Sequence, residues 1–93
     1  MKIQFIKSIN DIPYDERYPL AKEEHRGKVS RVIGSEGRTL MIILPCGHHS
    51  TIDGWDITDI DTDMPSATPS IFCQGMDGKG CWHGYLTKGE LIT

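Results

Sequence analysis

Two short segments that place a cysteine and a histidine one residue apart constrain this chain more than any other feature. They lie in residues 45–49 (PCGHH) and residues 80–84 (GCWHG). In an extended chain, residues i and i+2 point to the same side. Two such pairs on neighbouring strands can therefore direct two sulfurs and two nitrogens to one point, which is the tetrahedral arrangement that zinc prefers.

The predicted zinc site uses the four residues that share this spacing, Cys46, His48, Cys81 and His83. Two alternatives stay open at this point. Cys73 can replace one of the histidines and give the common Cys3His set. His49 can replace His48 if the turn is tight, because Cys-x-x-His is also a suitable spacing. Four protein ligands leave no position for water, so the predicted Zn2+ is structural.

The length and composition of the chain favour a small domain that needs extra stabilisation. Its 93 residues predict a single metal-binding domain, residues 1–93. A chain of this size buries only about 60–65% of the surface that its unfolded form exposes. Hydrophobic residues make up 38% of the sequence, so the core is small and a metal ion would help to hold the fold.

The cysteine count favours metal binding over disulfide bonding. Three cysteines cannot all be joined in pairs. The first residues enter directly into an alternating pattern, so we expect no signal peptide. The longest apolar run, residues 40–44, is too short to cross a bilayer. We therefore expect a cytoplasmic protein with no membrane partner, and clustered cysteines in a reducing compartment bind metal.

Alternating and apolar segments predict a mostly β fold of hairpins clamped by zinc, similar to a zinc ribbon. The predicted strands are residues 2–7, 28–33, 38–44, 50–57, 71–73, 82–87 and 90–93. The continuous apolar character of residues 38–44 indicates a central strand covered on both faces. At most one short helix is expected, near residues 19–26, where Pro19 can occupy the first turn and Gly27 can end it.

The charge pattern argues against a nucleic-acid binder and leaves two surfaces for a protein partner. The net charge is −3, whereas nucleic-acid binders usually have a basic face. Residues 53–63 contain five aspartates without a Lys or Arg, and they lack the central glycine and closing glutamate of a calcium loop. This stretch is either a solvated loop or a surface that captures a partner with a basic groove. The charged segment 14–27 is likewise a solvated surface or a docking surface.

Several motifs in the second half of the chain resemble a family of small phage and prophage proteins of unknown function. Three segments carry this resemblance: the run from Pro65 to Ile71, the segment Cys81-Trp82-His83-Gly84-Tyr85-Leu86, and Gly89-Glu90-Leu91. It covers roughly residues 40–92. Members commonly show a Cys-Gly segment, a Trp, a Pro-Ser stretch and a Cys-His pair before a hairpin. Some carry the name ammonia monooxygenase, but nothing in this sequence provides a membrane copper site.

The resemblance implies a phage or prophage origin, hence the host cytoplasm, and a small metal-binding domain. It supports Cys46, Cys81 and His83 as ligands and Trp55 and Pro69 as structural landmarks. Many relatives have a second cysteine shortly before the Cys-Gly segment, where this chain has Leu-Pro at residues 44–45. The resemblance therefore implies that a histidine of residues 48–49, or the cysteine at position 73, supplies the missing ligand.

These observations lead to a zinc-stabilised binding module, a phage accessory protein that engages a protein partner, as the expected function. We expect a role other than catalysis and assign no catalytic residue. One alternative is a Rieske-like electron carrier, although the second Rieske motif has two residues between its cysteine and histidine, where Cys81 and His83 have one. Another is a small zinc hydrolase, with three metal ligands and Asp53 or Asp56 as the general base.

Overall fold

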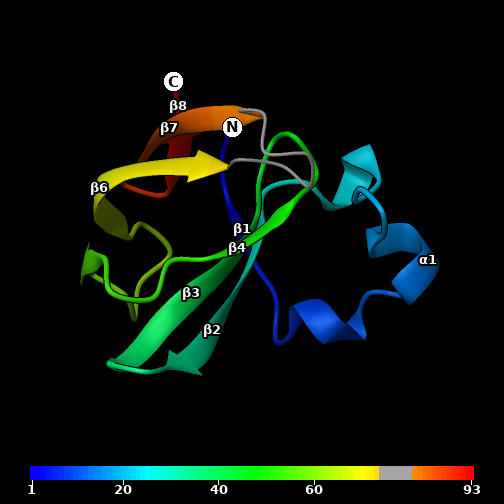
Figure 1. Ribbon diagram of the computed structural model, residues 1–93. Helices are drawn as coiled ribbons and strands as arrows, with labels where there is room; N and C mark the ends of the chain where they lie inside the picture. Colours follow the sequence, from blue (N-terminus) through cyan, green and yellow to red (C-terminus); the bar gives the residue numbers. More distant parts are fainter. Residues whose placement is uncertain (74–80) are drawn as a thin grey trace.

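The computed structural model describes residues 1–73 and 81–93, and most of their regular structure is β (Figure 1). The strands are β1 (Gln4–Phe5), β2 (Lys28–Gly34), β3 (Gly37–Ile43), β4 (His49–Thr51), β5 (Asp56–Thr58), β6 (Ser66–Cys73), β7 (Trp82–Thr87) and β8 (Glu90–Ile92). The helical elements are α1 (Tyr14–Arg17) and two 3-10 turns, η1 (Ile9–Asp11) and η2 (Glu23–His25). The predicted mostly β fold is confirmed.

The first sheet has the strand order β1-β2-β3-β4. β1 is parallel to β2, and the other two pairs are antiparallel. The β2–β3 hairpin closes where Gly34 pairs with Gly37, at the glycine turn that the sequence indicates. The central position predicted for the third strand is confirmed, because Leu40, Ile42 and Ile43 of β3 are all fully buried.

The second sheet is antiparallel throughout, in the order β5-β6-β7-β8. Its last hairpin turns at Lys88 and Gly89, which both have positive φ, 46° and 77°. This is the type I′ turn that suits a two-residue hairpin. The chain before β1 joins the two sheets, since the Ile3 N–H donates to the Gly89 carbonyl and Lys2 forms a β-bridge with Glu90.

The main core lies between the two sheets, and a smaller one lies on the outer face of the first sheet. Residues of the main core come from both sheets and from the segments between them: Val29, Leu40, Ile42, Leu44, Ile52, Ala67, Ile71, Cys73, Leu86 and Leu91. The smaller core consists of Ile9, Ile12, Ala21 and Ile43. The helical segment that contains α1 covers this second core, to one side of the sheet in Figure 1.

Several predicted elements have other boundaries in the structure, and the first strand is shortened from residues 2–7 to Gln4–Phe5. Helix α1 ends before the expected region, because Tyr18 precedes a proline and takes an extended backbone, with φ −126° and ψ 148°. The single strand expected at residues 50–57 is divided into β4 and β5 by a turn, in which the Trp55 N–H donates to the Ile52 carbonyl. The strand expected at residues 71–73 begins at Ser66 and tolerates Pro69, which lies at the register irregularity between β6 and β7.

None of the helices in residues 1–73 and 81–93 combines the length and the apolar character that a membrane span requires.

Candidate metal centre

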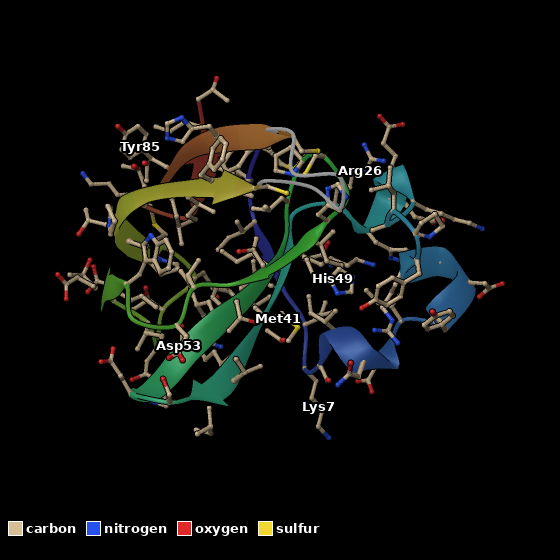
Figure 2. The ribbon with its side chains drawn as sticks, viewed as in Figure 1. Lys7, Arg26, Met41, His49, Asp53 and Tyr85 are labelled. Carbon is tan, nitrogen blue, oxygen red and sulfur yellow. The ribbon has the colours of Figure 1, made fainter. Side chains whose placement is uncertain are left out.

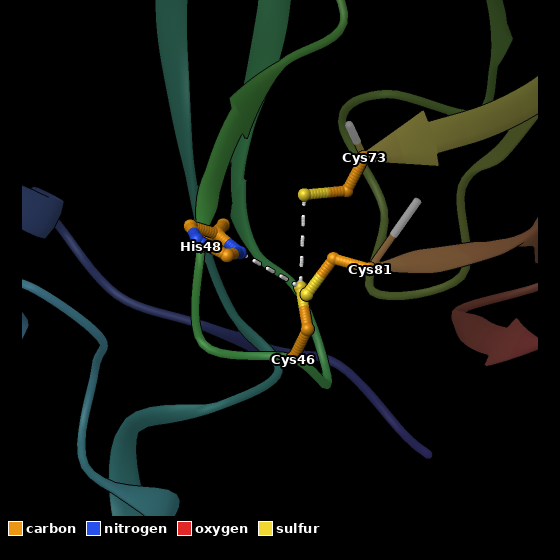
Figure 3. A group of neighbouring side chains, drawn as sticks. All are labelled: Cys46, His48, Cys73 and Cys81. Carbon is orange, nitrogen blue, oxygen red and sulfur yellow. Dashed lines mark hydrogen bonds between the residues drawn. The ribbon is translucent and has the colours of Figure 1, made fainter. Parts of the chain in front are cut away.

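Four side chains that can ligate a metal converge where the two sheets meet. They are Cys46, His48, Cys73 and Cys81, and their ligand atoms all lie within 4.8 Å of one another. Figure 3 shows the first two on the connection between β3 and β4, the third at the end of β6 and the fourth at the start of β7. This group could hold a metal ion with three sulfurs and one nitrogen.

The first two ligands lie on a tight turn between β3 and β4. The Gly47 N–H donates to the Leu44 carbonyl, and the Leu44 N–H donates to the His48 carbonyl. Gly47 has a φ of +94°, in the left-handed region that favours glycine. The turn therefore brings Cys46 and His48 together, and the Cys46 Sγ lies 3.4 Å from the His48 Nδ1.

A second segment, residues 21–27, holds this turn in place. The Arg26 guanidinium donates to the carbonyls of Ala21 and Pro45. The Ala21 N–H donates to the Gly47 carbonyl, and the Gly27 N–H donates to the Ile43 carbonyl. Supporting hydrogen bonds of this kind orient ligands and tune a metal site. Sequence reasoning missed the role of Arg26, because its acceptors are backbone carbonyls that no sequence pattern identifies.

The other two ligands lie side by side in the second sheet. Cys73 pairs with Trp82 in the register of β6 and β7, and the Cys81 N–H donates to the Cys73 carbonyl. Cys81 comes directly before Trp82, the first residue of β7, and so lies outside the paired register of the two strands. The alternation of side chains along β7 therefore does not fix the direction of Cys81, which joins the group of possible ligands while His83 does not.

His83 lies away from the four-residue group. Its ring meets the Phe72 ring edge-on at 5.5 Å, and its Nε2 lies 2.9 Å from the Ser70 Oγ. Both His83 and Phe72 are on the exposed face of the second sheet, where the register pairs them. The group of possible ligands therefore contains Cys73 and not His83. This set corresponds to the Cys3His alternative that the sequence left open.

His49, the other open alternative, lies on the opposite face of the first sheet from His48. It pairs with Ile43, a residue of the smaller core, and its ring lies 5.2 Å from the Tyr18 ring. Figure 2 shows it between the sheet and the helical segment. Burial, together with the positive charge of Arg17, lowers the pKa of His49. Side chains of consecutive strand residues point to opposite faces, so only one of the two histidines can face Cys46.

Access to solvent differs among the three thiols. Cys73 is buried, Cys46 is half-buried and Cys81 is exposed. The Cys46 Sγ lies 3.8 Å from the Cys73 Sγ. Burial raises the pKa of the Cys46 thiol, and a hydrogen bond from the His48 backbone acts in the opposite direction by favouring the thiolate. A metal ion would override the effect of burial, because a thiol that coordinates a metal is deprotonated.

A second group of possible ligands, Glu16, Glu24 and His25, lies beside α1. The His25 Nε2 lies 2.7 Å from the Glu16 Oε1, and the Lys28 Nζ lies 2.7 Å from the other ring nitrogen. The hydrogen bond with His25 lowers the pKa of Glu16. The ammonium group of Lys28 would repel a cation here, so Glu16, His25 and Lys28 are better described as a hydrogen-bonded network than as a metal site.

The aspartate stretch of residues 53–63 is partly neutralised by the first sheet. Asp61 forms an ion pair with Arg38, and the Asp53 carboxylate accepts hydrogen bonds from the Ser35 N–H and Oγ. These bonds lower the pKa of both carboxyls. Arg31 also donates to the Ile60 and Thr62 carbonyls. These partners of the aspartate stretch could not be identified from the sequence pattern, because they lie on β2, on β3 and on the turn between them.

In comparisons with known proteins, the chain matches no family model, no curated protein and no solved structure. The geometry of the residues therefore carries the functional argument. Three sulfurs and one nitrogen also differ from the two cysteines and two histidines that hold a Rieske cluster.

Proposed function

We propose that the protein is a binding module whose fold is stabilised by one structural zinc ion, held by Cys46, His48, Cys73 and Cys81. The observation that carries this proposal is the convergence of these four ligands from both sheets. Thiolates together with imidazole are the donor set of structural zinc sites. The ion would fasten the end of the first sheet to the second, where a small core has little other support.

Two of the distances within the group fit a tetrahedral zinc site. Zinc–sulfur bonds of about 2.3 Å and zinc–nitrogen bonds of about 2.0–2.1 Å place tetrahedral ligands about 3.8 Å apart for two sulfurs and about 3.6 Å apart for a sulfur and a nitrogen. The corresponding distances are 3.8 Å between Cys46 and Cys73 and 3.4 Å between Cys46 and His48. The sulfur of Cys46 would therefore need to move little relative to Cys73 and His48 when the ion binds.

Two features favour a structural over a hydrolytic zinc. Four protein ligands complete a tetrahedral shell and leave no position for an activated water. A cavity of about 430 Å³ borders Pro45 and Trp82, which are neighbours of two ligands in sequence. Among the lining residues within 1–73 and 81–93, no side chain is a carboxylate or imidazole that could act as a general base: Met1, Pro45, Trp82, Leu91, Ile92 and Thr93. A role in binding is therefore better supported than hydrolysis.

Native mass spectrometry of the purified protein tests the metal proposal. We expect one zinc ion per chain, and Cys73→Ser should reduce zinc occupancy strongly while His83→Ala should leave it unchanged. The two variants distinguish the two ligand sets, because the set predicted from the sequence spacing includes His83, whereas the set in the structure includes Cys73 instead. Absence of zinc from the wild-type protein, or iron with labile sulfide in its place, would refute the proposal.

The partner of this module is proposed to be a protein with a basic groove, and the resemblance to small phage proteins suggests an origin in a phage or prophage. The carboxylates that support this are Asp56, Asp59 and Asp63, which are exposed. Long-range attraction by such charges speeds the capture of a basic partner and weakens with salt.

A pull-down from host lysate at low and moderate salt tests the partner proposal. The variant changes Asp56, Asp59 and Asp63 together to Asn and leaves the Arg38–Asp61 pair intact. The control changes Asp11 to Asn and Glu90 to Gln, which are also exposed carboxylates but lie outside both the aspartate stretch and segment 14–27. Proteins lost from the Asn variant and retained by the control would support the proposal. Identical protein lists for all three forms would contradict it.

A further inference from the structure

The three thiols of the metal centre are unequally accessible, and this has a chemical consequence. Cys81 is exposed, whereas Cys73 is buried and belongs to the main core. Oxidation of cysteine follows thiolate character and exposure. A small oxidant in solvent therefore reaches the sulfur of Cys81 before that of Cys73.

We propose that Cys81 is an oxidative modification site, at which hydrogen peroxide converts the zinc centre into a Cys46–Cys81 disulfide and releases the metal. The inference rests on the proposed zinc site and adds a mode of regulation to it. Zinc keeps its thiolate ligands deprotonated, which is the reactive form, at neutral pH. The exposed thiolate is thus prepared for oxidation by the ion that it helps to bind.

The reaction takes two steps. In the first, the Cys81 thiolate attacks one peroxide oxygen, an S–O bond forms, the O–O bond breaks, and the departing hydroxide takes a proton to become water. In the second, the Cys46 thiolate attacks the sulfur of the resulting sulfenic acid. An S–S bond forms, the S–O bond breaks, and the second hydroxide is protonated to water. Two thiolates have lost two electrons, and the peroxide has gained them.

Accessibility favours Cys46 over Cys73 as the second thiol, because both sulfurs lie within 4.8 Å of the Cys81 sulfur. The Cys46 and Cys81 sulfurs lie within 4.8 Å of each other, and Cys46 is half-buried on a turn of the first sheet. Cys73 is held within β6, with its side chain in the main core. After the disulfide forms, only His48 and Cys73 remain as ligands, and two ligands from different sheets bind zinc far more weakly than four.

Peroxide treatment of the zinc-loaded protein tests this inference, with zinc content measured before the oxidant is added. We expect one zinc ion released per chain, a mass decrease of two hydrogens, and a Cys46–Cys81 disulfide in peptide maps. A reagent that traps sulfenic acid should label Cys81 first. Dithiothreitol should restore zinc binding, because a disulfide is reversible.

The matched variant is Cys81→His, which keeps a side chain that binds zinc but removes the exposed thiol. It should release zinc at about a tenth of the wild-type rate or less, because its remaining thiols are shielded. If that variant does not load zinc, sulfenic acid trapping in the wild-type protein still decides the matter. First labelling of Cys73, or retention of all zinc and thiols in peroxide that oxidises glutathione, would overturn this inference alone. Absence of zinc at the start would overturn the proposed function as well.

Discussion

Gly47 determines the shape of the first ligand turn, through both its φ and its surroundings. Its φ of +94° is one that L-residues rarely adopt. A Cβ at this position would lie 3.1 Å from the Arg26 Nη2 and 3.2 Å from the Ala21 backbone N and O. The residue therefore combines backbone freedom with close packing against the segment that supports the site.

Gly47→Ala should destabilise the fold and weaken metal binding. The backbone strain alone costs about 1–2 kcal/mol, and displacement of the supporting segment should lower zinc affinity about tenfold. Chemical denaturation and competition with a chelator measure the two effects. Gly37→Ala is the matched control, because Gly37 has a φ of +110° and a Cβ there would meet nothing within 4 Å. If both variants bind zinc equally well, the packing around Gly47 has no part in the site.

Arg26 supports the turn that carries Cys46 and His48, although it is not one of the four possible ligands. Arg26→Met removes its hydrogen bonds to the Ala21 and Pro45 carbonyls. We expect zinc affinity to fall about 10-fold or more, as for other partners that support metal ligands. Arg31→Met is the control, because it also loses two carbonyl hydrogen bonds, to Ile60 and Thr62, away from the site. Equal zinc affinity of the two variants would show that Arg26 contributes to stability only.

The hairpin of β7 and β8 shows how an element can depend on the conformation of one residue. Lys88 has a φ of +46°, whereas Asn is the residue that type I′ turns favour at this position. Lys88→Asn should therefore raise the free energy of unfolding by about 0.5–1 kcal/mol. Thermal unfolding measures the change. Lys7→Asn removes the same charge at an exposed residue that is not among those with positive φ, so asparagine has no such advantage there. Equal stabilisation by both variants would attribute the effect to charge.

The ion pair between Arg38 of β3 and Asp61 of the aspartate stretch makes the free energy of unfolding depend on pH. Hydrogen bonding and attraction to Arg38 lower the pKa of Asp61 in the folded chain. The folded state therefore binds fewer protons than the unfolded state at acidic pH. The stabilisation is fully present above the unfolded pKa of about 3.9 and is lost as pH falls through the folded pKa. Since both side chains are exposed, the effect is small.

An NMR titration of the aspartate carboxyl groups tests whether the pKa of Asp61 is lowered in the folded protein. Asp61 should titrate below the ordinary range in the wild-type protein, and Arg38→Gln should move its midpoint upward. Ser35→Ala should leave Asp61 unchanged and raise the midpoint of Asp53, whose pKa is lowered mainly by the Ser35 hydroxyl. A midpoint of Asp61 that does not respond to Arg38→Gln would contradict the pairing.

For the whole molecule, the metal centre is the proposed link between two sheets that otherwise share a small core. Removal of zinc with a strong chelator should cost several kcal/mol of folding free energy, because metal binding in small domains is largely folding energy. Loss of near-ultraviolet circular dichroism from Trp55 and Trp82 would report the loosened packing, since both pack against the main core. A chelated protein that keeps a sharp, native-like NMR spectrum would show that the site does not support the fold.

The local pattern of the sequence was sufficient for the mostly β fold, the buried third strand, the closing hairpin and the participation of Cys46 and Cys81 in a cluster of possible ligands. These features follow from alternation, apolar runs and turn residues, which act over a few neighbouring positions. Tertiary structure decided which other side chains join them. The pairing of His49 with Ile43 leaves His48 to face Cys46. Cys81 joins the group from just before β7, whereas His83 lies within the strand and on its exposed face. Cys73 enters the group because β6 pairs with β7, a contact between segments whose register depends on the packed core. Arg26 and the partners of the acidic loop were hidden for the same reason, since their bonds join residues that are distant in the chain.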